Sequence, residues 1–569
     1  EQSLAGWDGL GLAVQAYQKR APAVIDWLSE LARCSAHRFN IRLVKGAYWD
    51  SEIKLAQERG LSDYPVYTNK AATDISWLAC AAKLLDDPRA FYPQFATHNA
   101  LCVARVIEMA RQRKTSASEF EFQRLHGMGR ELYEPLIGQY PCRVYAPVGS
   151  HTDLLAYLVR RLLENGANSS FVHLLEDERI PPEELLADPL SRWIESRSRT
   201  PLPAPAALFA PQRKNSAGKD MNDAKTLGEL AHALDSSRQT RHQAGGSSAS
   251  TPTAAQEIRS PADAGDLVGI VFPAQPGDIE AALQKAPPAA RIWDKTPATA
   301  RAACLEHAAD LFEQHSEHLM ALIVREGGRT LPDALNECRE AIDFCRYYAA
   351  RARADFSQAS VLPGPTGEHN QLTLHGRGVF ACISPWNFPL AIFTGQIAAA
   401  LAAGNAVIAK PAGQTPLIAA AAVSLFHTAG IPAHALQLLI GDGRTGAALV
   451  ADPRIDGVAF TGSTDTARYI HQSLASRGKT SGTASIAPLI AETGGLNVMI
   501  ADSSTLPEQL VRDVISSAFN SAGQRCSALR VLYLQDDIAD RVLPLLAEAM
   551  QELSIGDPSK ISTDIGPLI

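Results

Sequence analysis

Short apolar runs alternate with amphipathic stretches along the first third of the chain. Runs rich in β-branched and aromatic residues are typical of strands, and apolar residues at every third or fourth position are typical of helices. The predicted strands are Gly11–Gln15, Asn40–Lys45, Gln94–Thr97, Glu121–Leu125 and Arg143–Ala146. The predicted helices are Ala23–Ala32, Asp74–Leu85, Ala100–Arg111 and Asp153–Asn165. Because no short return hairpin separates the strands, the pattern predicts a parallel sheet.

Polar side chains directly follow several of these strands. Lys45 ends the second strand, His98 follows the third and His126 follows the fourth. Active-site groups gather at the carboxyl ends of the strands in a (β/α)8 barrel, so this placement predicts part of such a barrel. The predicted strands are too few to close an eight-stranded barrel, and we expect its first strands to precede residue 1.

The alternation of strands and helices returns between Asp263 and Ile569. Helices are predicted at 277–287, 299–326 and 332–353. The predicted strands that follow are Val379–Ile383, Ala406–Ala409, Leu436–Ile440, Gly457–Phe460 and Pro488–Ala491. Repeated strand and helix units predict a doubly wound, Rossmann-like sheet, so the fold class is α/β in both halves.

The composition and net charge of the chain argue against several classes of protein. With 46% hydrophobic and 20% charged residues, the 569-residue chain is too apolar for a disordered protein. The formal net charge of −8 argues against a nucleic-acid-binding surface, which needs an excess of Lys and Arg. The 9 cysteines form no C-x-x-C pair and are odd in number, so they predict neither a disulfide framework nor a metal site. We therefore expect a cytoplasmic protein without a bound metal.

Two glycine-containing segments are candidates for binding a dinucleotide. Gly441–Gly446 matches the pattern G-x-G-x-x-G after a predicted strand, but no acidic residue ends the next strand as that fingerprint requires. A closely packed turn therefore has at least equal weight there. Thr461–Thr464 is the better candidate for a pyrophosphate, because it follows an apolar strand and opens a helix with free N–H groups.

Further motifs in the second half follow one another in a fixed order. They are Ser384–Pro389, Lys410–Pro411, Phe460–Thr464, Glu492–Gly495 and Gly523–Ser527. Taken singly, their polar residues would be a packing cysteine, a turn cap and a surface carboxylate. In this order and at these intervals, they resemble the aldehyde dehydrogenase superfamily.

The resemblance implies a thiol-based oxidation of an aldehyde. Cys526 would be the nucleophile, the Asn387 amide and the Cys526 N–H would hold the oxyanion, and Glu492 would activate water.

The resemblance also implies NAD as the cofactor. Lys410 would contact the adenosine ribose, and Gly462 and Ser463 the pyrophosphate. Gly413 stands where the family often has a Glu that binds the ribose hydroxyls, which weakens the expected preference for NAD over NADP.

Motifs in the first half resemble the proline dehydrogenase barrel. They are Arg42–Trp49, Thr97–Asn99 and Tyr157–Gly166. The residues that the resemblance implies for FAD are Gln15, Arg42, Lys45, Gly46, Thr68, Lys70, Thr97, His98 and Ser170. Those implied for proline are Tyr48, Tyr145, Arg160, Arg161 and Glu164.

The helix that carries the two arginines suits an amino-acid substrate. Glu164 lies four residues after Arg160 and three after Arg161, so it can orient both guanidinium groups. Two oriented guanidinium groups suit a carboxylate, which Arg binds in a bidentate fork. Taken alone, this helix would be an ion-paired surface and His98 a satisfied core histidine.

The two resemblances in one chain together are similar to the bacterial proline utilization A family. That family implies oxidation of L-proline with FAD and oxidation of glutamate semialdehyde to L-glutamate with NAD. It also implies channelling of the intermediate, a homo-oligomer, peripheral membrane association and a quinone as electron acceptor. The alternatives are an aldehyde dehydrogenase fused to a non-catalytic barrel and a thiol acyltransferase or esterase.

These patterns divide the chain into four parts. We expect the end of a proline dehydrogenase barrel over 1–175 and a Pro-, Ala- and Ser-rich connector over 176–260. An NAD-binding domain with preceding helices would occupy 261–500, and the start of a catalytic domain 501–569. We therefore expect an internal segment of a longer protein.

Overall fold

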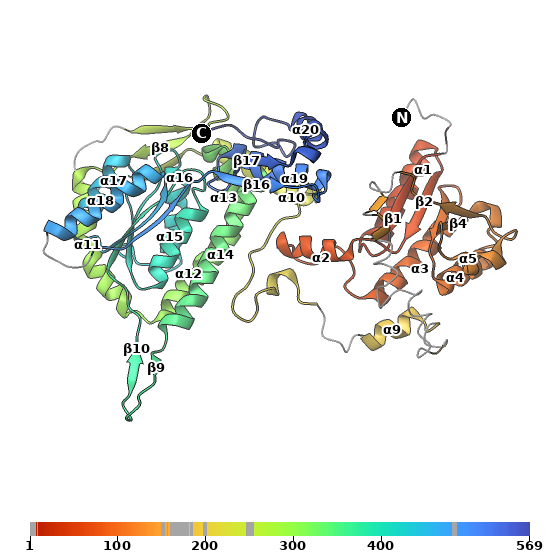
Figure 1. Cartoon of the computed structure of the whole chain (residues 1–569), viewed down its shortest axis with the longest axis horizontal. Coiled ribbons are helices and arrows are strands. Elements are labelled where there is room, and N and C mark those ends of the chain that lie inside the picture. The colour runs from red at the N-terminus through yellow and green to blue at the C-terminus, as the bar shows by residue number, and fades with distance from the viewer. Residues whose placement is uncertain are drawn as a thin grey trace. The chain divides into compact units, whose positions relative to one another are not determined.

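The strands and helices form two separate units, Glu1–Pro205 and Ala206–Ile569. The computed structural model describes residues 7, 9–149, 154–155, 157–159, 181, 186–196, 202–245, 255–480 and 486–569. Figure 1 labels the helices and strands of both units.

The first unit contains a parallel sheet in the order β1-β2-β3-β4-β5. Its strands are β1 (Gly11–Gln15), β2 (Phe39–Val44), β3 (Phe91–Ala96), β4 (Glu121–Leu125) and β5 (Cys142–Tyr145). Its helices are α1 (Ala21–Ser35), α2 (Trp49–Glu58), α3 (Lys70–Asp86), α4 (Ala100–Arg113), α5 (Arg130–Tyr133) and α9 (Pro189–Ser196). All neighbouring strands pair in parallel, which confirms the predicted sheet.

Alternation along β2 separates the core of this unit from its polar face. Ile41 and Leu43 are fully buried, whereas Arg42 between them is half-buried. Successive side chains of a strand point to opposite faces, so Arg42 lies on the face away from the core. On the core face, the ring of Phe95 lies 6.1 Å from Trp77 and 6.2 Å from Phe122, between centroids. The sheet therefore has an aromatic core on one face, and the polar side chain of Arg42 lies on the opposite face.

The second unit contains a parallel sheet in the order β13-β12-β11-β14-β15. Its strands are β11 (Val379–Ile383), β12 (Ala406–Lys410), β13 (Leu436–Leu438), β14 (Gly457–Gly462) and β15 (Leu489–Thr493). The helices of this unit are α10 (Ala224–Gln239), α11 (Pro276–Lys295), α12 (Ala298–Gln314), α13 (Ser316–Gly327), α14 (Leu331–Phe356), α15 (Ala391–Ala402), α16 (Pro416–Thr428), α17 (Gly443–Ala451) and α18 (Thr464–Thr480).

Both faces of this sheet are covered by helices (Figure 1). Every residue of β11 and β12 is buried, as expected for a parallel sheet between two helical layers. Phe380 and Cys382 pack in the cluster of α12 to α16, and Ala381 and Ile383 pack with α11, α17 and α18. The order of the strands, with the first one central, confirms the doubly wound prediction.

One predicted helix is wrong in its extent. The stretch 299–326 is two helices, because α12 ends at Gln314 and α13 begins at Ser316. Between them, His315 has φ −99° and ψ 16°, outside the helical region. The break changes the direction of the chain, so that α13 packs on α10 as well as on α14, whereas α12 packs mainly on α14.

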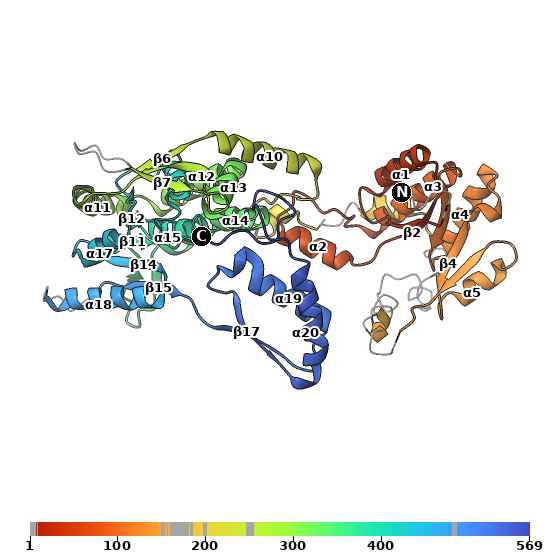
Figure 2. The same ribbon diagram turned by 90° about the horizontal axis from the view of Figure 1, so that it is seen from above.

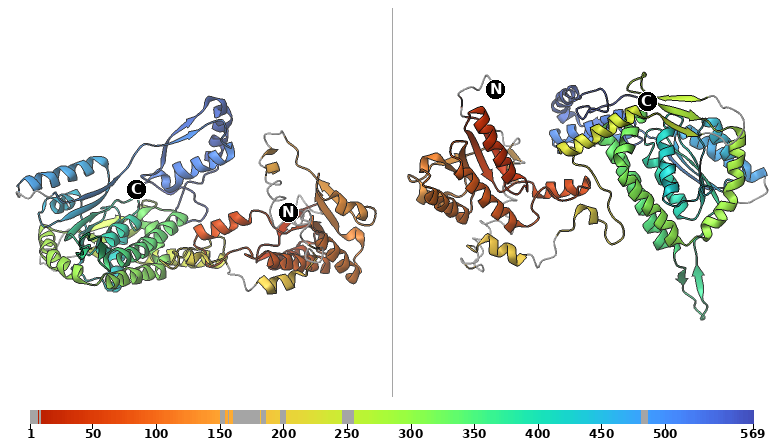
Figure 3. Two further views of the ribbon diagram at one scale, coloured as in Figure 1. Left: turned by 60° about the horizontal axis from the view of Figure 1, so that its bottom comes forward. Right: turned by 180° about the vertical axis from the view of Figure 1, so that it is seen from behind.

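Smaller sheets complete the second unit. They are formed by β6 (His242–Gly245), β7 (Gln256–Arg259) and β8 (Leu267–Phe272), by β9 (Ser360–Leu362) and β10 (Asn370–Leu372), and by β16 (Asn497–Ala501) and β17 (Leu529–Leu534). The helices α19 (Pro507–Phe519) and α20 (Asp536–Gln551) lie on one side of the β16–β17 pair (Figures 2 and 3).

The range 176–260, predicted as a connector, contains α9, α10, β6 and β7.

No helix in the described part of the chain is both long and apolar enough to cross a membrane.

Candidate active sites

The first candidate site lies at the carboxyl ends of the strands of the first unit. Arg42 stands in β2, and its guanidinium carbon lies 4.2 Å from the ring centroid of Tyr145 at the end of β5. The arrangement is a cation–π contact, which fixes the plane of the guanidinium group. The Arg42 Nε is buried and has no hydrogen-bond partner in the described structure. A buried N–H without a partner is costly, so this atom is a donor that a ligand can satisfy.

A turn after β2 brings the backbone close to the same strand ends. Gly46 has φ +143°, and a Cβ there would lie 2.3 Å from the Tyr17 ring, so only glycine fits. The next residue is held on both sides, because Ala47 N–H donates to Gln15 Oε1 at 2.9 Å and Ala47 O accepts from the Tyr17 hydroxyl. Gln15 thus orders the turn that carries Lys45 and Gly46.

Positive groups gather around one carboxylate beside this turn. Lys45 Nζ forms an ion pair with Asp74 Oδ1 at 2.5 Å. Lys45, Lys70, Asp74, Cys102 and Arg192 line one small cavity. Burial lowers the pKa of Lys70, and the neighbouring Lys45 and Arg192 lower it further while Asp74 opposes them. Three cations around one acid leave an excess of positive charge, which suits an anion such as a phosphate.

Arg192 and Asp74 were not predicted as site residues. Arg192 stands in α9, inside a Pro-rich segment whose basic residues resemble a solvated surface in the sequence. Asp74 is an unmarked residue of a predicted helix. Only the packing of α9 on α3 brings Arg192 to the cavity, and that contact leaves no local signal in the sequence.

Thr97 and His98 follow β3 and are held by the neighbouring strand and helix. Thr97 is buried, its Oγ1 accepts from Asn99 N–H at 3.1 Å, and its carbonyl accepts from the Tyr133 hydroxyl at 2.7 Å. Leu125 N–H donates to His98 Nε2 at 3.2 Å. Because Nε2 accepts, a neutral His98 carries its proton on Nδ1.

The structure describes only part of the predicted proline-contacting set. Tyr48 is 59% exposed and caps α2 with a left-handed backbone, at φ 70°. The predicted site residues outside the described residues are Arg160, Arg161, Glu164 and Ser170. Thr68 is described and precedes Asn69, whose side chain caps the first turn of α3.

The second candidate site joins two loops of the second unit. The loop after β11 carries Asn387, and the loop before β17 carries Cys526, which is exposed. Asn387 Nδ2 donates to the Gln524 carbonyl at 3.0 Å, two residues before the cysteine. The structure thus brings Asn387 and the Cys526 loop together. Asn497 Nδ2 also donates to the Cys526 carbonyl at 2.7 Å and holds the loop against β16.

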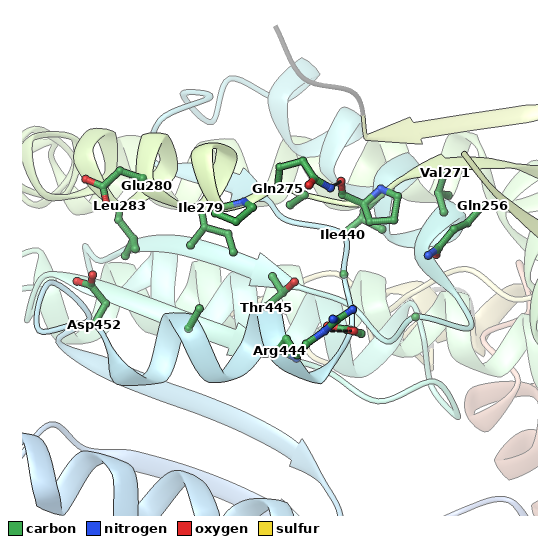
Figure 4. A pocket seen from close by; sticks show the side chains of 17 residues that line it. Gln256, Val271, Gln275, Ile279, Glu280, Leu283, Ile440, Arg444, Thr445 and Asp452 are labelled. Carbon is green, nitrogen blue, oxygen red and sulfur yellow. Dashed lines mark hydrogen bonds and ion pairs between the residues drawn. The ribbon is translucent and has the colours of Figure 1, made fainter. Parts of the chain in front are cut away.

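A cavity of about 670 Å³ lies between α11 and α17 (Figure 4). Its lining includes Ile279 and Leu283 of α11, Thr445 of α17, and the glycines 413 and 441. A Cβ at Gly413 would meet nothing within 4 Å, whereas one at Gly441 would lie 2.1 Å from Thr445 Oγ1. The segment 441–446 is therefore both a close-packed turn and a cavity wall.

The remaining predicted cofactor residues lie at strand ends of the same sheet. Lys410 ends β12, and its Nζ makes no hydrogen bond or ion pair within the described residues; burial lowers its pKa and Asp442 opposes that shift. The Ser463 hydroxyl accepts from Thr466 N–H at 3.2 Å and so caps the start of α18. A Cβ at Gly462 would lie 2.6 Å from the Phe460 ring.

Glu492 is exposed on β15, and no hydrogen bond or ion pair of the described residues joins it to Cys526.

Two buried glutamates anchor the helices that follow these loops. Glu337 Oε1 accepts from Leu390 N–H at 2.7 Å, at the start of α15 just after the Asn387 loop. Glu326 accepts from Leu417 and Ile418 N–H groups, both at 2.8 Å, at the start of α16. Burial raises the pKa of Glu337 to about 7 and that of Glu326 to about 8, against the lowering effect of these bonds.

The roles of Glu326 and Glu337 were not predicted from the sequence either. A signal exists for Glu337, which interrupts the apolar stripe of Ala334, Cys338 and Ala341 on a predicted helix. A charged residue on a buried stripe needs a polar partner. The identity of that partner, the start of another helix, is set by tertiary packing.

Comparisons with known proteins cover both units. Residues 248–569 match the aldehyde dehydrogenase family, and residues 1–174 match proline dehydrogenase. Over its whole length the chain is 51% identical to Bifunctional protein PutA of Escherichia coli (strain K12), of which it spans 43%.

Solved structures agree with this assignment. A mutant of Bradyrhizobium japonicum Proline Utilization A is 53% identical, with a TM-score of 0.89 over 100% of this chain and 55% of that one. Thermus thermophilus 1-pyrroline-5-carboxylate dehydrogenase is 32% identical, with a TM-score of 0.58 over 62% of this chain and 69% of that one.

The chain thus spans less than half the length of the curated PutA relative it matches along its whole sequence. It belongs to the aldehyde dehydrogenase family and, with a proline dehydrogenase domain at 1–174, is a PutA-like chain in which the two domains follow one another.

Proposed function

We propose that the chain takes part in two consecutive oxidations of proline catabolism. The first unit oxidises L-proline to pyrroline-5-carboxylate with FAD. The second oxidises glutamate semialdehyde, its hydrolysis product, to L-glutamate with NAD. The observation that carries the proposal is that one chain matches both enzyme families in this order.

The strand ends of the first unit suit a flavin dinucleotide. Arg42 offers a buried Nε without a partner, and Gly46 leaves the backbone open where a side chain would collide with Tyr17. Lys45, Lys70 and Arg192 supply the positive charge that a pyrophosphate needs. Gln15, Thr68, Thr97, His98 and Ser170 complete the proposed set.

The cavity between α11 and α17 suits the adenosine part of NAD. Its apolar walls, Ile279 and Leu283, can cover a base, and Lys410 lies at the end of the neighbouring strand. Gly462 and Ser463 would hold the pyrophosphate at the start of α18, where the partial positive charge of a helix N-terminus favours an anion. Bound FAD accepts the electrons of proline oxidation, and bound NAD accepts the hydride of aldehyde oxidation.

The loops of the second site supply the covalent chemistry. The Cys526 thiolate adds to the carbonyl carbon of the aldehyde. The Asn387 amide donates to the oxygen as negative charge develops on it, together with the Cys526 N–H. After oxidation to the thioester, Glu492 takes a proton from the water that releases L-glutamate.

In the first site, the residues of this chain bind and orient proline. The Tyr48 and Tyr145 rings would flank the ring of the substrate. The Arg160 and Arg161 guanidinium groups, oriented by Glu164, would bind its carboxylate in a bidentate fork.

We also propose a cytoplasmic location and assembly into a homo-oligomer. The 9 free cysteines support a reducing compartment. Peripheral membrane association, a quinone as electron acceptor and channelling between the sites stay predictions of the family resemblance.

A spectrum of the purified protein tests the proposal. We expect a flavin absorbance that L-proline bleaches, and formation of NADH when glutamate semialdehyde and NAD are added. A colourless protein that FAD cannot reconstitute would favour the non-catalytic barrel. Ester hydrolysis dependent on Cys526 without any NADH would favour the thiol acyltransferase or esterase.

A further inference from the structure

The backbone just before Cys526 passes through three consecutive left-handed residues. Ser521 has φ 58° and ψ 30°, Ala522 has φ 55° and ψ 31°, and Gly523 has φ 67°. This conformation crowds Cβ against the backbone, so it is unfavourable for Ser and Ala but not for Gly. Among the described residues, Ser521 and Ala522 are the only neighbouring non-glycine residues with positive φ. Such strain persists only where the surroundings hold it.

Asp333 of α14 holds the first strained residue from outside the loop. The Ser521 hydroxyl donates to Asp333 Oδ2 at 2.9 Å, and Ser521 is only 5% exposed. Within the loop, the backbone N–H and the side-chain Nε2 of Gln524 donate to the Ser521 carbonyl at 3.0 and 3.3 Å. The hydrogen bond to a carboxylate is stronger than these neutral ones, because its acceptor is charged.

The strained turn 521–523 also fixes the two groups of the proposed oxyanion site. The Gln524 carbonyl accepts from Asn387 Nδ2, and Cys526 follows two residues later. An amide nitrogen carries two N–H bonds, so the bond to Gln524 directs the second one. A shift of the turn would move the Asn387 amide and the thiol together.

We propose that Asp333 is a positioning residue for Cys526 and Asn387. Its carboxylate accepts a hydrogen bond from the Ser521 hydroxyl, and this bond holds the strained turn 521–523. Through Gln524, the turn sets the positions of the Cys526 loop and of the Asn387 amide. The inference rests on the proposed aldehyde oxidation for its kinetic effect, but its structural part does not.

Asp333→Ala tests the role when combined with Ala522→Gly. Asp333→Ala should lower kcat for aldehyde oxidation about tenfold, or about 1.4 kcal/mol, with the KM for NAD unchanged. Adding Ala522→Gly removes strain from the turn and should return kcat to within about threefold of the starting protein. Asp333→Asn, which still offers a carbonyl oxygen to Ser521, should lose less than Asp333→Ala. Asp355→Ala, on the same helix and away from the loop, is the matched control and should leave kcat unchanged.

Hydrogen exchange of the Gln524 amide tests the same role without a substrate. Asp333→Ala should speed exchange in the peptide that contains Gln524 about tenfold, and Ala522→Gly should reverse this, with α14 unaffected.

Unchanged exchange in Asp333→Ala, or equal losses of kcat with and without Ala522→Gly, would overturn the proposal. Equal losses in Asp333→Asn and Asp333→Ala would assign the effect to charge and would also overturn it. Altered exchange in a protein that forms no NADH would leave the positioning role intact and overturn the proposed function alone.

Discussion

The two candidate sites are held in place in different ways. In the first unit, Arg42 and Tyr145 stand on strands of one sheet, whose ladder of backbone hydrogen bonds sets their spacing. In the second unit, Asn387 and Cys526 stand on loops. These loops are tied to α14 by the carboxylates of Glu337 and Asp333.

This difference decides what a change far from the chemistry should do. A sheet distributes its support over many backbone bonds, so no single side chain carries the position of Arg42. A loop held by a few side-chain hydrogen bonds shifts when one of the charged acceptors is removed. Replacing Asp333 or Glu337 should therefore impair aldehyde oxidation and spare proline oxidation.

Replacing the nucleophile should give the largest separation of the two activities. In Cys526→Ala, aldehyde oxidation should fall by at least about 10³-fold, because no thiol is left to form the thioester. Proline oxidation, followed with an artificial electron acceptor, should stay unchanged. Cys34→Ala, at the other exposed cysteine, is the control. Full aldehyde oxidation in Cys526→Ala would contradict the proposed mechanism.

Removing the Glu337 carboxylate should give the largest loss of stability. Glu337→Ala leaves two N–H groups of α15 unsatisfied and Arg329 without its buried ion partner at 3.7 Å. We expect a loss of about 3–5 kcal/mol in unfolding free energy, measured by denaturant titration. Glu337→Gln keeps the oxygen that accepts both N–H groups, so it should cost about 1–2 kcal/mol. Equal losses in the two variants would show that the helix cap is unimportant.

The pH dependence of stability should report on Glu326. Its pKa is raised from 4.5 to about 8 by burial, so between these values the folded state binds a proton that the unfolded state has lost. The contribution of Glu326 to stability is therefore largest in acid and decreases as pH rises across this window. Glu326→Gln should reduce that decrease by about 1–3 kcal/mol, seen by denaturant titration at a series of pH values. The exposed Glu552→Gln should leave the profile as it is, and an unchanged profile in Glu326→Gln would contradict the account.

A change of cofactor preference should be the smallest effect. Gly413 lines the proposed adenosine cavity, and a Cβ there meets nothing within 4 Å. Gly413→Glu should add a charge-assisted hydrogen bond to the ribose and raise the ratio of kcat/KM for NAD over NADP about tenfold. Gly443→Glu is the matched control, since a Cβ there also meets nothing but Gly443 is outside the cavity lining. A ratio that rises equally in both variants would place the adenosine elsewhere.

The sequence contained most of the information for the sheets. Alternation along β2 and unbroken apolar runs in β11 and β12 marked the strands, because a strand repeats every two residues and a buried parallel strand is apolar on both faces. The break at His315 left no such signal, since the apolar pattern continues across it and only the directions of packing change.

The supporting residues of the sites were not predictable in the same way. Asn387 and Cys526 lie in recognisable motifs, but Asp333 and Glu337 act on segments far along the chain, and Ser521 is 188 positions after Asp333. Arg192 reaches its cavity only because α9 packs on α3. Such partners are set by tertiary packing and are not read from local pattern.

The most direct test of two sites on one chain is a single recording of flavin and NADH absorbance after L-proline is added in the presence of NAD. In the starting protein, the flavin should bleach first and NADH should follow. In Cys526→Ala, the flavin should bleach equally fast and no NADH should form. NADH formation in Cys526→Ala, or a flavin that proline leaves oxidised in both proteins, would contradict the account.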